Sequence, residues 1–146
     1  MPEKETLERA EKDKREGKSA STQAGEFVHE EIEHVREGKH GVRSTKQAIA
    51  IGLSKARRAG VKLPPSKTAS KKTREQAARD VKKGETTTAK KSTKRSRAVS
   101  AALKREGHSA ASKSALSRQA RSAAKKRTAT ARSQSAKKAA RTRQKA

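Results

Sequence analysis

The sequence predicts a mainly α protein: short helices, a small helical hairpin, and a basic C-terminal tail that is largely disordered or conditionally helical. Three observations lead to this fold class. Glycines recur after charged, helix-favouring runs, the large apolar residues are concentrated in one stretch, and the rest of the chain is too polar to build a core of its own.

The chain is poor in large apolar residues and rich in charge. Of its 146 residues only 15 are Ile, Leu, Val or Phe, 38% are charged, and the net charge is +25. Such a chain cannot bury enough apolar surface to offset the entropy of folding, so most of it is expected to stay disordered until a partner neutralises it. Ten of the 15 apolar residues lie in residues 27–63, which places any core there.

Glycine follows five charged runs, such as "KREG" and "VREG", and by subtraction these glycines lie 21 to 24 residues apart: Gly17, Gly38, Gly60, Gly84 and Gly107. Glycine readily adopts the left-handed conformation that ends many helices, and basic residues favour the last helical turn. Each run therefore predicts a helix end. The apolar positions do not recur from unit to unit as a stacked repeat requires, so the even spacing reflects helix plus loop length.

Serines and threonines after each glycine can cap the next helix through their side-chain oxygens. The candidates are Ser21 or Thr22, Ser44, Thr73, Thr93 or Ser96, and Ser109 or Ser112. Ser44 with Gln47, and Thr73 with Gln76, also have the spacing of a reciprocal capping box.

These boundaries divide the chain into three segments. Residues 1–20 are a charged N-terminal helix or arm, residues 21–63 form the helical hairpin, and residues 64–146 are a basic tail rich in Ala, Lys, Arg and Ser with short helical segments. Pro64 and Pro65 end the hairpin because proline cannot continue a helix.

Two amphipathic runs predict the hairpin, which turns through residues 38–43. The first places these residues on one face, with Phe27 beside them: Ala24, Val28, Ile32 and Val35. The second aligns three residues and flanks them with a small-residue strip: Ile49, Leu53 and Ala56, then Ala48, Gly52 and Ala59. Because so small a core does not offset its own ordering entropy, we expect the hairpin to need a second copy or nucleic acid to hold firmly.

The histidines and acids of the first hairpin helix do not predict a catalytic or metal site. In "HEEIEH", His29 and His34 are five residues apart, about 140 degrees round a helix, whereas a zinc-binding helix places its histidines four apart. We therefore expect surface histidines, no metal and no cofactor. The acidic residues predict a solvated face or ion-pair partners for the basic second helix and the tail: Glu30, Glu31, Glu33 and Glu37. No phosphate loop, nucleophile elbow or Cys/His pair is present, so we expect no enzyme.

Charge is distributed unevenly along the chain. Residues 1–20 are neutral, residues 21–38 sum to −4, residues 39–63 to +7 and residues 64–146 to +22, with no acid after Glu106. A tail of this density needs a polyanion, and nucleic acid is the usual one. With one Phe and no Tyr or Trp there is no platform on which single-stranded bases could stack, so duplex DNA phosphates are the expected target.

The candidate nucleic-acid-binding residues are the lysines and arginines of the second hairpin helix and of the tail. In the hairpin these are Arg43, Lys46, Lys55, Arg57, Arg58 and Lys62. In the tail they are Lys94, Arg95, Arg97, Lys104, Arg118, Arg121, Lys125, Lys126, Arg127, Arg132, Lys137, Lys138, Arg141 and Arg143.

The segment "STKQAIAIGLSKARRAGVKLP", Ser44 to Pro64, resembles the characteristic segment of a small bacterial domain of unknown function. That domain occurs in short lysine-rich proteins often labelled only as uncharacterised or DNA-binding, and the resemblance covers roughly residues 25–65. The tail resembles in composition the Ala/Lys-rich tails of linker histones and of bacterial histone-like proteins.

Together these features predict a bacterial, nucleoid-associated or histone-like protein of the cytoplasm that binds DNA without sequence preference, with no membrane span and with homodimerisation left open. Two alternatives remain. One is a basic protein associated with RNA or the ribosome, and the other is a protein-interaction module in plasmid maintenance or stress regulation.

Overall fold

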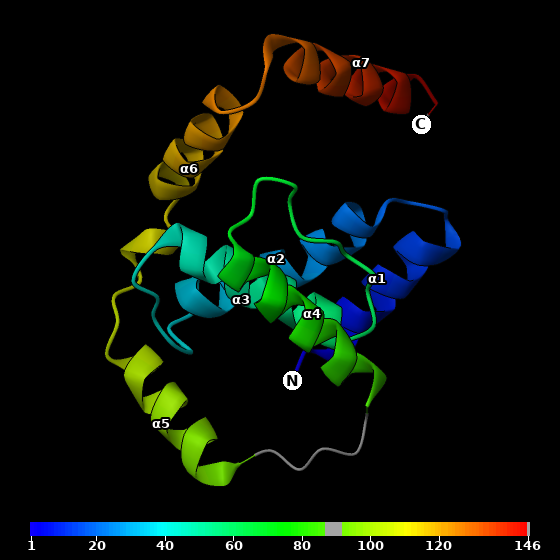
Figure 1. Cartoon of the computed structure of the whole chain (residues 1–146). Coiled ribbons are helices and arrows are strands. Elements are labelled where there is room, and N and C mark those ends of the chain that lie inside the picture. The colour runs from blue at the N-terminus through cyan, green and yellow to red at the C-terminus, as the bar shows by residue number, and fades with distance from the viewer. Residues whose placement is uncertain (87–91, 146) are drawn as a thin grey trace. The chain divides into compact units, whose positions relative to one another are not determined.

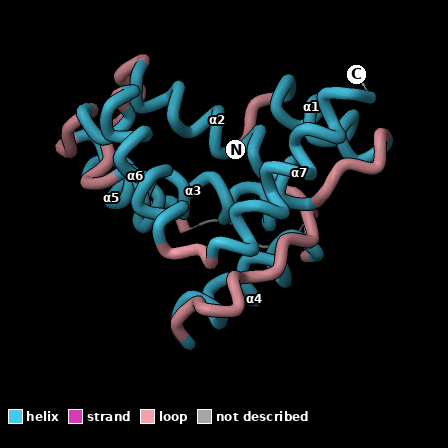
Figure 2. Tube along the Cα trace, turned by 90° about the horizontal axis from the view of Figure 1, so that it is seen from above, coloured by secondary structure: helices cyan, strands magenta, loops and turns pink. Residues whose placement is uncertain are grey.

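The computed structural model describes residues 1–86 and 92–145, which contain seven α-helices, one short 3-10 helix and no strand (Figures 1 and 2). In chain order these are α1 (Lys4–Arg15), α2 (Ala20–Arg36), α3 (Thr45–Arg58), α4 (Lys71–Glu85), α5 (Thr93–Lys104), η1 (Ser109–Ala111), α6 (Lys113–Lys125) and α7 (Ala129–Lys145). The predicted mainly α fold class is confirmed. In the described part of the chain no helix is both long and apolar enough to cross a membrane.

The chain forms two compact units, Met1–Ala111 and Ser112–Ala146. The first therefore continues well beyond residue 63, where the sequence placed the end of the hairpin segment. The expected basic tail, residues 64–146, includes residues 87–91 and 146, which lie outside the described residues.

Three of the five glycine stops are confirmed. Gly17, Gly38 and Gly60 have φ angles of 70°, 75° and 94°, and the backbone around each makes the paired hydrogen bonds of a Schellman motif. After α3, for example, Val61 N–H donates to Ala56 O at 3.0 Å and Gly60 N–H to Arg57 O at 3.1 Å. At the other two runs a helix also ends, at Glu85 and at Lys104, but glycine does not end it: Gly84 still belongs to α4, Gly107 lies beyond α5, and neither has a positive φ.

Helix starts follow the predicted chemistry, although several begin earlier than expected. Ser44 and Ser112 are N-caps as predicted. The other three caps are also serines, each one to three residues upstream of a predicted candidate: Ser19, Ser70 and Ser92. At Ser44 the capping box is altered, because Gln47 Oε1 accepts a hydrogen bond from Arg43 N–H at 2.9 Å instead of from the cap residue.

The hairpin of α2 and α3 is present, and the small residues of α3 that it buries are Ala48, Gly52 and Ala56, whereas Ala59 of the expected small-residue strip is exposed at the end of the helix. Ala48 and Ala56 are fully buried, whereas Ile49 and Leu53, expected to lead the face, are only half-buried. Gly52 lets the helices approach so closely that an added Cβ would lie 2.7 Å from the Cα of Val28. Because small side chains let the backbones of α2 and α3 come close together, the larger Ile49 and Leu53 lie at the edge of the contact and not in its centre.

Two further helices cover the hairpin. α1 packs against α2 and buries Ala10, which joins Phe27 in the small hydrophobic core, and α4 packs against α3 and buries Ala77. In Figure 1, α4 lies across α3 within this unit. The hairpin thus gains apolar contacts from segments that composition alone did not place in the core.

A segment from the expected tail also docks on the turn between α2 and α3. The N–H groups of Gly41 and Val42 donate to Leu103 O and Gly107 O, both at 2.9 Å. Four side-chain contacts add to the docking: Arg36 Nε donates to Ala111 O, Thr45 Oγ1 to Ala110 O and Arg43 Nη2 to Glu106 Oε1, and His108 Nδ1 hydrogen-bonds to Val35 O. Residues 103–111 are therefore part of the folded unit.

The second unit is helical, which corrects the expectation of a largely disordered tail. Its helices, α6 and α7, are built mainly from alanine, lysine, arginine, glutamine and serine, of which Ala, Lys, Arg and Gln favour helix strongly. Ser112 starts α6 by accepting a hydrogen bond from Ala115 N–H at 3.2 Å. Helix propensity and capping therefore define these elements, while α7 has no buried residue.

Candidate nucleic-acid interface

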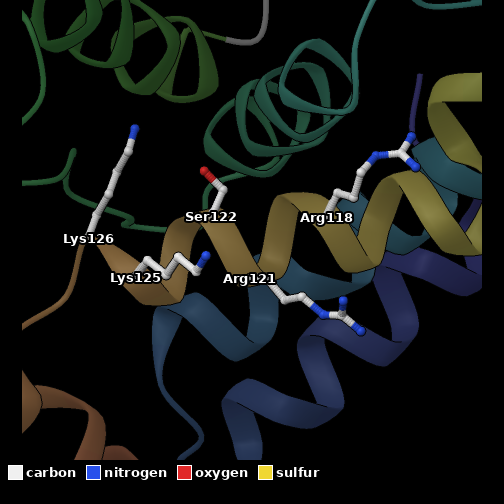
Figure 3. Close-up of a pocket in the computed structure, with 5 residues that line it drawn as sticks. All are labelled: Arg118, Arg121, Ser122, Lys125 and Lys126. Carbon is white, nitrogen blue, oxygen red and sulfur yellow. The ribbon is translucent and has the colours of Figure 1, made fainter.

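α6 gathers cations on its surface. Arg118, Arg121, Lys125 and Lys126 are all exposed and line one hollow together with Ser122. Arg118, Ser122 and Lys126 follow one another at intervals of four residues, and Arg121 and Lys125 are also four apart, the spacing that brings side chains of a helix next to one another. Figure 3 shows Arg118, Ser122 and Lys126 pointing to the same side of the helix. Four cations and a hydroxyl on α6 and its C-cap Lys126 form a site that fits phosphate oxygens.

α7 extends the same chemistry within the second unit. Its predicted residues Arg132, Lys137, Lys138, Arg141 and Arg143 are all exposed. The loop before it contributes a further predicted residue, Arg127, whose guanidinium donates to Ala131 O at 3.1 Å and to the Ser135 hydroxyl. The sequence from 112 to 146 contains twelve lysines and arginines and no acid, so these cations have no carboxylate side chain in their own unit.

α5 is a separate basic element of the first unit. Its predicted residues Lys94, Arg95, Arg97 and Lys104 are exposed, and the helix contains no acid. Within α5 no residue is buried, and apart from its end at Leu103, which docks on the turn between α2 and α3, the helix surface is available to a ligand.

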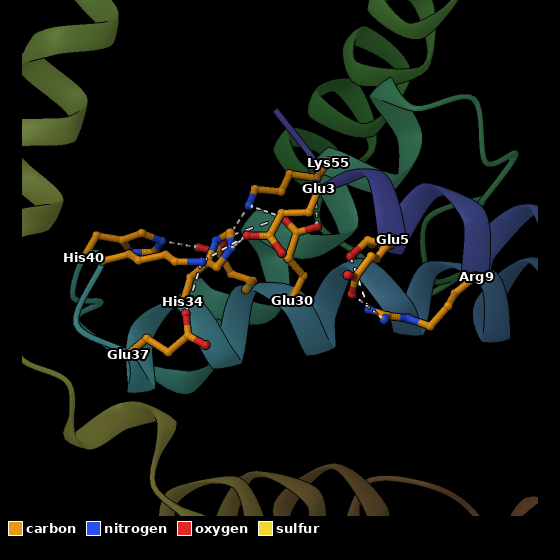
Figure 4. Close-up of polar contacts among 11 residues, drawn as sticks. Glu3, Glu5, Arg9, Glu30, His34, Glu37, His40 and Lys55 are labelled. Atoms are coloured by element: carbon orange, nitrogen blue, oxygen red, sulfur yellow. Dashed lines mark hydrogen bonds and ion pairs between the residues drawn. The ribbon is translucent and has the colours of Figure 1, made fainter.

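Three of the six predicted hairpin residues serve the fold itself. Lys55 Nζ lies 2.8 Å from Glu31 Oε2 and 3.1 Å from Glu30 Oε1 (Figure 4). Arg57, only 9% exposed, donates through Nε to Leu63 O at 3.0 Å. The third is Arg58. All three residues lie in the last turn of α3, and each makes a polar contact inside the first unit.

Arg58 pairs with Asp80 of α4, through Nε at 2.9 Å and Nη2 at 2.8 Å. Burial raises the pKa of Asp80, but hydrogen bonds from Ser54 and Arg58 outweigh that effect and lower the pKa below its ordinary value. The carboxylate therefore stays charged and joins α4 to α3.

Lys55 shows the same balance with the opposite charge. Burial lowers its pKa, while Glu31 and Glu30 outweigh burial and raise the pKa above the usual value. Glu30 and Glu31 of α2 thus form ion pairs with the basic second helix, which was one of the two expected roles. The other expectation, a solvated acidic face, is wrong for these two residues because both are buried.

The other three hairpin residues remain accessible. Lys46 and Lys62 are exposed, and the side chain of Arg43 is 82% exposed although it lies 3.1 Å from Glu106 Oε1. Together with α5 and with Arg58, whose side chain is 47% exposed beside Asp80, these positions are the predicted cations that the first unit offers to solvent.

α4 carries basic residues that the sequence prediction left out. Its buried positions are Ala77 and Asp80, and these lysines and arginines are exposed: Lys71, Lys72, Arg74, Arg79, Lys82 and Lys83. The spacing of Ala77 and Asp80 marks one helical face, but an aspartate does not look like a core residue in sequence. For this reason the sequence placed α4 in the basic tail and not in the folded unit.

Residues 12–67 match a family of unknown function (DUF6496), which covers α2, α3 and the end of α1. This supports a helical domain of unknown function in that part of the chain. No curated protein and no solved structure matches the sequence.

Proposed function

We propose that this protein binds duplex DNA through its phosphates, without sequence preference. The observation that carries the proposal is the second unit, in which twelve cations and no acid stand on two helices and the loop between them. Exposed lysines and arginines next to phosphates release condensed counterions, and this release supplies most of the affinity of non-specific DNA binding.

The distribution of acids supports the same assignment. In the first unit, carboxylates of α2 and α4 hold Lys55 and Arg58 within the fold. In the second unit no such carboxylate exists. The cations of α6 and α7 therefore have the least internal competition for a phosphate partner.

Side-chain chemistry favours double strands over single strands. The one aromatic residue, Phe27, is 1% exposed and cannot stack on a base. Binding to single-stranded nucleic acid draws much of its affinity from such stacking. On this proposal the protein is a histone-like, nucleoid-associated component of a bacterial cytoplasm.

The test compares two full-length variants that each lose four positive charges. The first changes the α6 group to glutamine: Arg118, Arg121, Lys125 and Lys126. The matched control changes four exposed cations of α1, where acids are interleaved with bases: Lys4, Lys12, Lys14 and Arg15. Affinity for a random-sequence duplex is measured by fluorescence anisotropy across a range of salt concentrations.

We expect the slope of log affinity against log salt to fall by about 0.9 for each phosphate contact that the α6 variant loses. The α1 variant should keep the wild-type slope more closely. Equal losses of DNA affinity in both variants would mean that only the net charge of the protein matters and not the position of the cations. An affinity that does not change with salt would contradict the proposal. Tighter binding to structured RNA than to duplex DNA at equal salt would assign the surface to RNA.

A further inference from the structure

A second polar site lies at the end of α2. Glu31 and His34 stand three residues apart on α2, and His40 comes from the turn that follows. One ligand atom from each of these residues lies within 4.8 Å of the others. Figure 4 shows His34 and His40 close together, beside Glu30 and Lys55, and their rings are nearly perpendicular with centroids 6.3 Å apart.

All three side chains are shielded from water. Their exposed fractions are 1% for Glu31, 13% for His34 and 18% for His40. Neither oxygen of Glu31 makes a hydrogen bond of acceptable geometry. Its Oε2 does face the ammonium group of Lys55 at 2.8 Å, so the unsatisfied oxygen is Oε1, which lies 3.2 Å from His40 Nε2.

The hydrogen bonds of the two rings determine where their lone pairs are. His40 Nδ1 contacts the carbonyl oxygen of Gly41 at 3.1 Å and must donate its proton there. His34 Nε2 contacts Glu3 Oε1 at 2.9 Å and must likewise donate. In the neutral rings this leaves lone pairs on His40 Nε2 and His34 Nδ1. A lone pair of His40 then faces an unsatisfied carboxylate oxygen, an arrangement that requires a cation between them.

We propose that Glu31, His34 and His40 bind one divalent transition-metal ion of the zinc class. Two imidazoles and one carboxylate are an established ligand set for zinc and related metals. Histidine ligands usually donate their second ring N–H to a carboxylate or a backbone carbonyl, and Glu3 and Gly41 already accept those two hydrogen bonds. The site thus holds three ligands and the groups that orient them.

The surrounding charges favour a cation. Glu3, Glu30 and Glu31 contribute three negative charges around the site, and Lys39 and Lys55 contribute two positive charges. Lys55 contacts Oε2 of Glu31 and leaves Oε1 to the metal. The His29–His34 pair in the sequence does not predict this site, because the second histidine ligand comes from the turn and His29 is exposed.

The test uses the full-length protein after treatment with a chelator. Cobalt(II) is added first, because its visible absorption reports coordination, and Zn²⁺ is then titrated in competition with a chromophoric chelator. We expect one equivalent of metal per chain. His34→Gln and His40→Gln should each weaken Zn²⁺ binding by at least about tenfold, while the control His29→Gln on the same helix should bind as wild type does.

A measurement on the wild-type chain keeps the test independent of variant folding. In a histidine-ring NMR spectrum, one equivalent of Zn²⁺ should shift the signals of His34 and His40 and leave those of His29 and His108 in place. The proposal is overturned if these two rings do not respond to Zn²⁺. It is also overturned if the folded His34→Gln and His40→Gln variants bind metal as tightly as wild type, since a proton would then be the only cation between His40 and Glu31.

Discussion

Asp80 shows how a single charged residue replaces apolar contacts in this protein. Its carboxylate accepts hydrogen bonds from Ser54 at 2.7 Å and from Arg58 at 2.9 Å, both on α3, and from Gln76 of its own helix at 3.2 Å. The residue is 1% exposed. A chain with so few large apolar residues therefore attaches α4 through polar contacts as well as through Ala77.

The change Asp80→Asn should destabilise the first unit by about 2 kcal/mol, because hydrogen bonds to a charged group contribute about 1.5–3 kcal/mol and the amide cannot reproduce them all. Urea unfolding followed by circular dichroism measures the loss. The matched control is Glu75→Gln on the exposed side of the same helix, which should stay within about 0.5 kcal/mol of wild type. Similar losses in the two variants would show that charge on α4 matters and the contact does not.

The contribution of Asp80 should also depend on pH. Its pKa in the folded chain is lowered from the ordinary value of 3.8, so the unfolded chain takes up the proton first as pH falls. The stabilisation is therefore complete well above pH 3.8 and is lost as pH falls through the folded pKa. The difference in free energy of unfolding between wild type and Asp80→Asn should shrink over that range, and a constant difference would contradict the ion-pair assignment.

At the scale of elements, the close approach of α2 and α3 depends on the missing side chain of Gly52. An added Cβ would lie 2.7 Å from Val28 Cα and 3.0 Å from Phe27 O, both of which belong to the backbone of α2. These atoms cannot rotate away as a side chain could. The two helices would have to separate.

Gly52→Ala should destabilise the protein by about 1–3 kcal/mol, the usual effect of overpacking a core. Gly25→Ala on α2 is the matched control, because a Cβ there meets nothing within 4 Å. Alanine is the better helix former by about 1 kcal/mol, so the control should be stabilised. Thermal unfolding measures both, and stabilisation by both changes would mean that α2 and α3 are not in close contact.

The elements also show how far the sequence alone could be used. Glycine after a basic turn correctly predicted the ends of α1, α2 and α3, because a left-handed residue and its Schellman hydrogen bonds are local properties. The packing of α4 could not be predicted in the same way, since it depends on a buried aspartate and on an arginine 22 residues away. The cluster of Glu31, His34 and His40 was missed for a similar reason: the turn, and not the helical period, brings the second histidine into place.

The site prediction divides along the same line. Exposure of the cations on α5, α6 and α7 follows from composition, because segments without large apolar residues leave their side chains in water. On α3 similar cations lie next to buried carboxylates, so Lys55 pairs with Glu31 and is largely buried, and Arg58 pairs with Asp80 while its side chain stays 47% exposed. Local composition could not distinguish these two outcomes.

At the scale of the whole molecule, the two units should differ in how well their backbone amides resist exchange with solvent. α2 and α3 contain most of the buried residues, whereas α7 contains none. On α7, Lys137, Arg141 and Lys145 follow one another at intervals of four residues, where like charges repel and weaken a helix. Phosphates next to these side chains would remove that repulsion.

We therefore expect duplex DNA to slow amide exchange in α6 and α7 while the exchange of α2 and α3 stays as it is in the free protein. Hydrogen exchange with mass spectrometry on the full chain, with and without DNA, measures the change for each helix. Slower exchange confined to α2 and α3 would move the binding surface to the hairpin.

The docking of residues 103–111 on the hairpin turn has a consequence for the order of folding. Three of its side-chain contacts join residues that are 65, 73 and 75 positions apart, whereas the α2–α3 contacts are local. Closing so long a loop costs more chain entropy than closing a hairpin, and only a few hydrogen bonds offset that cost. We expect the docking of residues 103–111 to form after the α2–α3 hairpin during folding and to be lost before it during unfolding. The second unit begins directly after Ala111. Mechanical force applied to that unit would therefore detach residues 103–111 from the turn and leave the hairpin folded.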